Sequence, residues 1–135
     1  MKPETFDFLG FTHYCSQSKK GKFRVKRKTS RKKYRASVLK CKEWLKKNRN
    51  MPAPELMAKL KVKLHGYDRH YGITDNIIAV QKYHYEVEKL LFKWLNRRSQ
   101  RKSFDWSKFE KFLRKFPLPR PKIYVNIYEI KPGLL

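Results

Sequence analysis

The stretch that decides the fold is residues 75–98, DNIIAVQKYHYEVEKLLFKWLNRR. Its apolar residues recur every three or four positions, which places them on one face of an α-helix. That apolar face comprises Ile77, Val80, His84, Val87, Leu91 and Trp94. We therefore expect a long helix that Asp75 caps and that reaches Arg98 or beyond, with this face buried in a core.

Two further helices are expected before this stretch, because the same period continues there. Thr29 and Ser30 are candidate N-caps of the first helix, which ends near Asn48. Pro54 suits the first turn of the second helix, which Gly72 ends. The apolar faces of the two helices are Tyr34, Val38, Cys41 and Leu45, and Leu56, Leu60, Leu64, Tyr67 and Tyr71.

The chain ends in a shorter helix and a proline-rich tail. Asp105 can cap this helix, whose apolar residues are Trp106, Phe109, Leu113 and Phe116. Helical structure then stops at three prolines, Pro117, Pro119 and Pro121. Residues 123–130 are expected to form a short strand.

The first thirty residues are expected to be extended. Residues 6–14 alternate imperfectly between apolar and polar side chains, residues 16–21 supply a polar turn, and residues 22–27 alternate cleanly. The sequence therefore predicts a mainly α fold, in which a short N-terminal β-hairpin is followed by a three- to four-helix bundle.

The charge of the chain points to a polyanionic partner. Its 135 residues include 35 Lys and Arg against 11 Asp and Glu, a formal net charge of +24. A compact body with this excess attracts polyanions, so nucleic acid is the first expectation and an anionic membrane surface is its rival. A surface whose charge serves only solubility needs far fewer charged residues, so this interpretation is disfavoured. Because no apolar run approaches the roughly 20 residues of a membrane span, we expect no membrane partner.

The cysteines and the N-terminus bear on the compartment. Cys15 and Cys41 match no metal-ligand spacing, and so few cysteines suit a reducing compartment. Pro3, Glu4 and Asp7 interrupt the N-terminus, which argues against a secretory signal peptide. We expect a soluble protein of a bacterial-type cytoplasm, with an organelle matrix as the alternative.

A basic run over residues 19–35 is the most informative local feature. Eleven of its seventeen residues are Lys or Arg, and no acid occurs between Asp7 and Glu43. Such a run neutralises phosphates and releases their counterions, which gives salt-sensitive binding. A second basic cluster follows the long helix; there, stabilisation of the helix dipole and contact with RNA are equal alternatives. The candidate RNA-binding residues are Lys19, Lys20, Lys22, Arg24, Lys26, Arg27, Lys28, Arg31, Lys32, Lys33 and Arg35 in the run, and Arg97, Arg98, Arg101 and Lys102 in the cluster.

The aromatic residues and the acids allow more than one interpretation. The candidates for stacking on unpaired bases are Tyr67, His70, Tyr71, Tyr83, His84 and Tyr85. A place in the core is favoured for Tyr67 and Tyr71. The acids Asp7, Asp68, Asp75 and Asp105 are interpreted as caps and turns. Because the acids are scattered and the histidines lack ligand spacing, we predict no catalytic residue, no metal, no cofactor and no enzyme activity of this chain alone.

Several short motifs follow one another along nearly the whole chain. They are Phe8-Leu-Gly-Phe11, Gly21-Lys-Phe-Arg-Val-Lys26, Lys28-Thr-Ser30, Gly66-Tyr-Asp-Arg-His-Tyr-Gly72, Leu90-Leu-Phe-Lys-Trp-Leu-Asn-Arg-Arg-Ser99, Trp106-x-x-Phe109 and Pro117-Leu-Pro-Arg-Pro121. In this order they resemble the C-terminal portion of group II intron-encoded reverse transcriptases and maturases. Each motif is weak alone, whereas the ordered series is specific.

The resemblance implies a division of the chain. Residues 1–28 would be a hairpin from the end of the reverse-transcriptase palm, and residues 29–116 the helical maturase-specific thumb, or domain X. Residues 117–135 would be a proline-rich tail. The primer-grip positions would be Phe8, Leu9, Gly10 and Phe11. The family's Tyr-Ala-Asp-Asp catalytic motif is missing, and Asp68 and Arg69 stand where relatives often carry an aromatic residue and Asn.

The resemblance leaves two main functional hypotheses. In the first, the chain is a maturase domain that binds structured group II intron RNA and promotes its folding and splicing, while the RNA performs the chemistry. In the second, it is the thumb of a split or truncated reverse transcriptase and grips template and primer for a separate fingers–palm polypeptide. A gene remnant that folds poorly is the third hypothesis.

Overall fold

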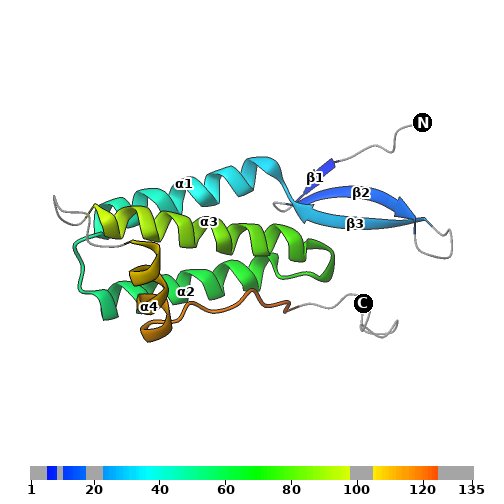
Figure 1. Cartoon of the computed structure of the whole chain (residues 1–135). Helices are drawn as coiled ribbons and strands as arrows, with labels where there is room; N and C mark the ends of the chain where they lie inside the picture. The colour runs from blue at the N-terminus through cyan, green and yellow to red at the C-terminus, as the bar shows by residue number, and fades with distance from the viewer. Residues whose placement is uncertain (1–5, 9–10, 18–22, 98–104, 125–135) are drawn as a thin grey trace.

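A computed structural model describes residues 6–8, 11–17, 23–97 and 105–124. For residues 6–8, 13–17, 23–27 and 74 it describes the backbone alone. The chain is mainly helical, with a small antiparallel sheet before the helices (Figure 1). The predicted fold class is therefore confirmed.

The sheet has three strands in the order β1 (Phe6–Phe8), β2 (Phe11–Gln17) and β3 (Phe23–Thr29). β2 and β3 form the expected hairpin, with Phe11 opposite Thr29 and Gln17 opposite Phe23. The sequence did not indicate a separate β1, because residues 6–14 read as one extended segment. β1 pairs with β2 in an antiparallel register, in which Phe8 lies opposite Phe11.

The helices are α1 (Arg31–Asn48), α2 (Ala53–Tyr71), α3 (Ile77–Asn96) and α4 (Trp106–Lys115). A short 3₁₀ helix, η1 (Thr74–Asn76), leads into α3. Figure 1 shows α1, α2 and α3 side by side, with α4 across the end of the bundle that lies far from the sheet. α3 packs against both α1 and α2, and none of the described helices is long and apolar enough to cross a membrane.

Two of the three predicted side-chain N-caps, those of α1 and α4, are present in the structure. The Ser30 hydroxyl accepts a hydrogen bond from the Lys33 N–H at 3.2 Å, and the Asp105 carboxylate accepts one from the Lys108 N–H at 2.7 Å. The prediction for α3 was wrong: Asp75 lies inside η1, and Asn76 occupies the N-cap position. The 3₁₀ turn shifts the start of α3, and the Asn76 side chain is engaged in long-range hydrogen bonds instead of capping.

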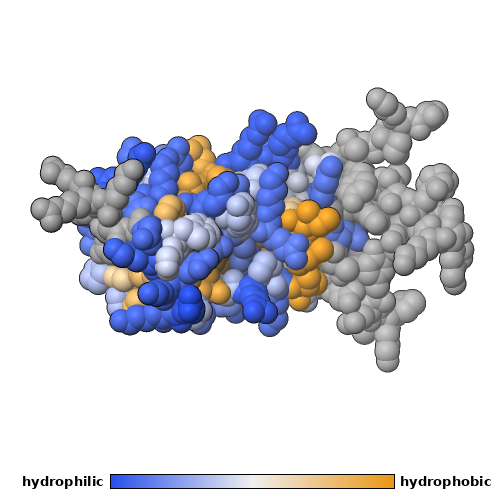
Figure 2. Space-filling view, in the orientation of Figure 1, coloured by the Kyte–Doolittle hydropathy of each residue, from blue (hydrophilic) through white to orange (hydrophobic). Residues whose placement is uncertain are grey.

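The core lies where α3 meets the other helices. Leu60, Val80, Leu91 and Phe109 are 0% exposed, and the predicted apolar faces supply most of the buried residues. Tyr67 and Tyr71 are buried, as favoured from the sequence. Figure 2 shows that hydrophilic side chains cover most of the bundle face toward the viewer, between separate hydrophobic patches.

The proline-rich segment after α4 returns along α2 toward the sheet (Figure 1). Residues 117–124 form neither helix nor strand. The strand predicted for residues 123–130 is thus absent at Ile123 and Tyr124, and its remainder lies outside the described residues.

Candidate nucleic-acid interface

A buried asparagine fixes the sheet to the helices. Asn76, 1% exposed, accepts a hydrogen bond from the Thr29 N–H at 2.6 Å and donates to the Thr29 hydroxyl at 2.7 Å. Its amide also donates to the Tyr71 carbonyl at 3.0 Å. One side chain thereby joins the end of β3, the end of α2 and the start of α3, which holds the N-terminus of α1 in a defined position.

Phe11 provides the apolar part of the same joint. It is buried, with its ring centroid 5.3 Å from that of Tyr71 and 6.0 Å from that of His70. Of the other predicted primer-grip positions, Phe8 lies in β1, and Leu9 and Gly10 lie outside the described residues. The primer-grip role stays a prediction, and what Phe11 does in this chain is to pack the sheet against α2.

A pocket of about 400 Å³ opens at this joint. Its cationic lining comes from three elements, because Lys28 lies near the end of β3, Arg31 begins α1 and Lys82 lies on α3. The remaining lining residues are Thr12, Thr29, Tyr34 and Ala79. The lining residues include two threonines but no acid, so the composition of the lining suits an anionic group.

The first turn of α1 adds more positive charge beside the pocket. Arg31, Lys32 and Lys33 are all exposed there, and the turn contains no acid. Cations at a helix N-terminus face the positive end of the helix dipole, an arrangement that opposes folding. A bound anion would offset this repulsion. Together with Arg35 on the next turn, the pocket cations and this turn form what we name the cationic junction: Lys28, Arg31, Lys32, Lys33, Arg35 and Lys82.

Tyr34 is an aromatic member of the pocket lining. The Lys82 ammonium lies 5.3 Å from the centroid of its ring. Burial raises the pKa of Tyr34, and the nearby Glu86 carboxylate raises it further, so the phenol stays protonated at neutral pH. Its buried hydroxyl has no hydrogen-bond partner in the described part of the chain.

The structure brings together only some of the predicted RNA-binding residues. Five of them lie exposed in the cationic junction: Lys28, Arg31, Lys32, Lys33 and Arg35. Three lie on β3, where the backbone alone is described: Arg24, Lys26 and Arg27. Six lie outside the described residues: Lys19, Lys20, Lys22, Arg98, Arg101 and Lys102.

Arg97 lies at the opposite end of the bundle, at the C-terminus of α3 (Figure 1). Its guanidinium lies 5.3 Å from the Trp94 ring, which Lys93 and Arg49 also approach, at 5.3 and 5.6 Å. These cations have partners within the protein, in the aromatic ring and the negative ends of the helices. The geometry therefore favours a role for Arg97 in contacting the Trp94 ring and the negative end of the α3 dipole, and Arg97 is not part of the cationic junction.

Lys82 was missing from the predicted site residues. The helical period of residues 75–98 places Lys82 outside the apolar face. The period alone does not show which of the exposed lysines lies close to another helix or strand. Its partners in the pocket, Lys28 and Arg31, lie about fifty positions away in the sequence. Only the packing of α3 against α1 brings these residues together.

A second cluster of polar groups is buried and fully paired. The Asp68 carboxylate, 0% exposed, lies 2.6 Å from Nε2 of His84, which is 9% exposed. His84 Nδ1 donates to the Pro119 carbonyl at 3.1 Å, because a carbonyl oxygen can only accept. The Lys122 N–H donates to the second Asp68 oxygen at 3.2 Å. The prediction of Asp68 as a cap or turn residue was wrong, since it binds the returning C-terminal segment.

Gly72 makes room for that segment. The Tyr124 N–H donates to the Gly72 carbonyl at 2.8 Å. A Cβ atom at Gly72 would collide with the Asp68 carbonyl and lie 2.6 Å from the Lys122 carbonyl oxygen. The segment can therefore pass this closely only over a glycine.

The aromatic residues proposed for base stacking are mostly unavailable at the surface. Tyr67, Tyr71, Tyr83 and His84 are buried, and Tyr67 stacks on Tyr83 with ring centroids 3.7 Å apart. His70 and Tyr85 remain exposed. Among the described residues, no three His, Cys, Asp or Glu side chains lie together in a way that could hold a metal ion.

The described residues form a small helical domain, which has a cationic pocket without an acid in its lining at one end. The family model of the group II intron maturase-specific domain matches residues 34–112, more than half of the chain. The chain belongs to this family, which associates it with a maturase role in group II intron splicing. No curated protein sequence and no solved structure is significantly similar to it. The domain boundaries at residues 28 and 116 stay predictions.

Proposed function

We propose that this chain is an RNA-binding maturase domain, which binds structured group II intron RNA through the cationic junction and so promotes folding and splicing. In this proposal the intron RNA performs the chemistry, and the chain contributes binding energy alone. The observation that carries it is the junction itself: three cations from three elements line a pocket without an acid in its lining, and three more lie in the first two turns of α1.

The chemistry of the junction suits the RNA backbone. Lys and Arg neutralise phosphates, while the pocket hydroxyls and the N-terminus of a helix can donate hydrogen bonds to phosphate oxygens. Asn76 holds the elements of the junction in a fixed arrangement, so the protein can read the spacing of phosphates in a folded RNA. Such recognition of shape and backbone is how proteins commonly recognise structured RNA.

The first test is a salt titration of binding to an in vitro transcribed group II intron RNA, compared with duplex RNA and duplex DNA of similar charge. If about 6–10 phosphates are contacted, affinity falls by roughly 10³–10⁵ between 50 and 200 mM salt. A preference for the intron RNA that persists at about 200 mM salt is expected, because counterion release alone treats equal polyanions alike. Equal binding to all three nucleic acids would contradict the maturase proposal.

A charge-reversal variant tests whether the RNA binds at the cationic junction. Changing Lys28, Arg31 and Lys82 together to Glu is expected to abolish binding to the intron RNA. The matched control changes Lys46, Lys47 and Lys61 to Glu, three exposed residues outside the junction, with the same change in net charge. Circular dichroism checks that both variants stay helical. Equal losses of affinity in the two variants would show that net charge, and not the junction, governs binding.

A further inference from the structure

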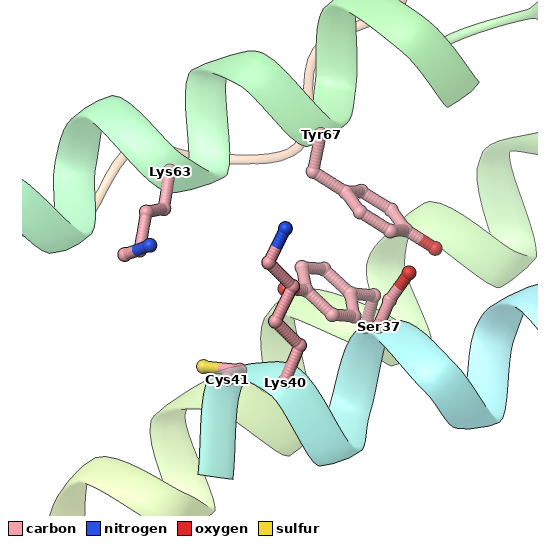
Figure 3. A pocket seen from close by; sticks show the side chains of 6 residues that line it. Ser37, Lys40, Cys41, Lys63 and Tyr67 are labelled. Atoms are coloured by element: carbon pink, nitrogen blue, oxygen red, sulfur yellow. The ribbon is translucent and has the colours of Figure 1, made fainter. Parts of the chain in front are cut away.

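A second pocket, of about 200 Å³, lies between α1 and α2, and no residue of the cationic junction lines it. Ser37, Lys40 and Cys41 line it from α1, and Lys63 and Tyr67 line it from α2 (Figure 3). Tyr83 of α3 completes the lining. Pockets for whole small molecules measure roughly 300–1,000 Å³, so this one suits a smaller group.

The two lysines of this pocket carry charge without a carboxylate partner. The lining contains no acid, and neither Lys40 nor Lys63 forms an ion pair with any described residue. The Lys63 ammonium lies 4.9 Å from the centroid of the Trp44 ring, which is not part of the pocket lining. An ammonium held in this way retains N–H donors that can reach an anion.

Lys40 approaches the pocket from the opposite wall. Figure 3 shows its amine directed from α1 into the space between the helices, toward the Tyr67 ring, with the Ser37 hydroxyl on the same side. Lys40 itself is exposed, and the buried aromatic residues Tyr67 and Tyr83 form part of the pocket wall.

The positive charge also acts on the buried thiol of the pocket. Burial raises the pKa of Cys41 to about 11, although the Lys63 ammonium and a hydrogen bond from Tyr83 act in the lowering direction. The thiol is therefore neutral at physiological pH and does not compete with an anionic ligand for the lysines.

We propose that this pocket is a second RNA contact, which binds one backbone phosphate of an extended strand between Lys40, Lys63 and the Ser37 hydroxyl. The inference rests on the proposed function, because it assigns a further contact to the same RNA partner. The same chemistry would also accept free phosphate, so the test includes both sources.

The test uses the full chain labelled with ¹⁵N and follows its amide resonances. One titration adds a single-stranded RNA of about ten nucleotides, and the other adds inorganic phosphate. We expect the amides of Ser37, Lys40 and Lys63 to shift with the RNA. In the variant Lys40→Ala, Lys63→Ala these shifts should disappear, and its affinity for the short RNA should be about tenfold weaker.

The matched control is Lys46→Ala, Lys61→Ala, which removes one exposed lysine from each of the same two helices. It should keep the shifts in the pocket. If the amides of Arg31 and Lys33 shift with RNA but those of the pocket do not, this inference is wrong and the proposed function stands. If the pocket amides shift with RNA but those of Arg31 and Lys33 do not, the proposed function at the cationic junction is wrong. A response to inorganic phosphate alone would support the anion site and reject RNA as its source.

Discussion

The cationic junction and the Asp68–His84 contact lie at the same end of the bundle, yet they use charge in opposite ways. In the junction, cations gather at an exposed helix N-terminus where the dipole repels them. In the contact, an acid and a histidine are buried together, and each makes a second hydrogen bond to the C-terminal segment. The second arrangement contains its counter-charge, whereas no acid is among the residues that line the pocket of the first.

This difference separates a binding surface from a structural contact. A buried pair whose partners are all present needs nothing from outside, and losing one partner leaves an uncompensated group in the core. A cluster of like charges opposes folding, and a bound external anion would relieve this repulsion. Variants in the contact should therefore reduce stability and preserve binding, and variants in the junction should do the reverse.

The largest effect on stability is expected from Asp68→Ala. The change leaves His84 buried without its carboxylate and frees the Lys122 N–H, and breaking a buried pair in this way costs about 3–5 kcal/mol. Urea unfolding measures the free energy of unfolding, and the folded fraction should bind intron RNA as wild type does. The control is Glu43→Ala, which removes an exposed acid. Equal stabilities of the two variants would mean that the contact does not hold the C-terminal segment.

An intermediate effect is expected from Gly72→Ala. The new methyl group would meet the Asp68 and Lys122 carbonyls, and overpacking of this kind costs about 1–3 kcal/mol. Gly66→Ala is the matched control, since a Cβ there has no neighbour within 4 Å and Gly66 lies inside α2. This control should gain about 0.5–1 kcal/mol, because alanine favours the helix. Thermal unfolding measures the stability of both variants. We expect a loss of stability for Gly72→Ala and a gain for Gly66→Ala.

The sequence predicted what depends on neighbours along the chain. The helical period identified the buried faces of α1, α2 and α3, because residues three and four positions apart share one side of a helix. The caps at Ser30 and Asp105 were also found, since each one accepts a hydrogen bond from an N–H only three positions away.

What the sequence did not predict depends on contacts between distant residues. Asn76 bonds to Thr29, which is 47 positions away, and Asp68 bonds to Lys122, which is 54 positions away. Asp68 and Asn76 are residue types that commonly serve as caps and turns, so their local sequence gave no sign of burial. Lys82 joins the junction for a similar reason, because only the packed helices bring it to Arg31.

The smallest effect on stability, and the sharpest contrast in sign, is expected from Arg31→Glu. A carboxylate in the first turn of α1 interacts favourably with the helix dipole, so the variant should gain about 0.3–1 kcal/mol. The same substitution removes a pocket cation and introduces repulsion toward phosphate, so affinity for intron RNA should fall. Chemical unfolding and RNA titration of the same sample measure both effects.

Lys46→Glu provides the test of the dipole argument, because it makes the same charge change in the last turn of α1. There the dipole favours a cation, so this variant should lose about 0.3–1 kcal/mol while binding RNA more strongly than Arg31→Glu does. A gain of stability in both variants would point to relief of overall repulsion among the cations and not to the helix dipole. Only the opposite signs would show that α1 begins with cations at a cost in folding free energy.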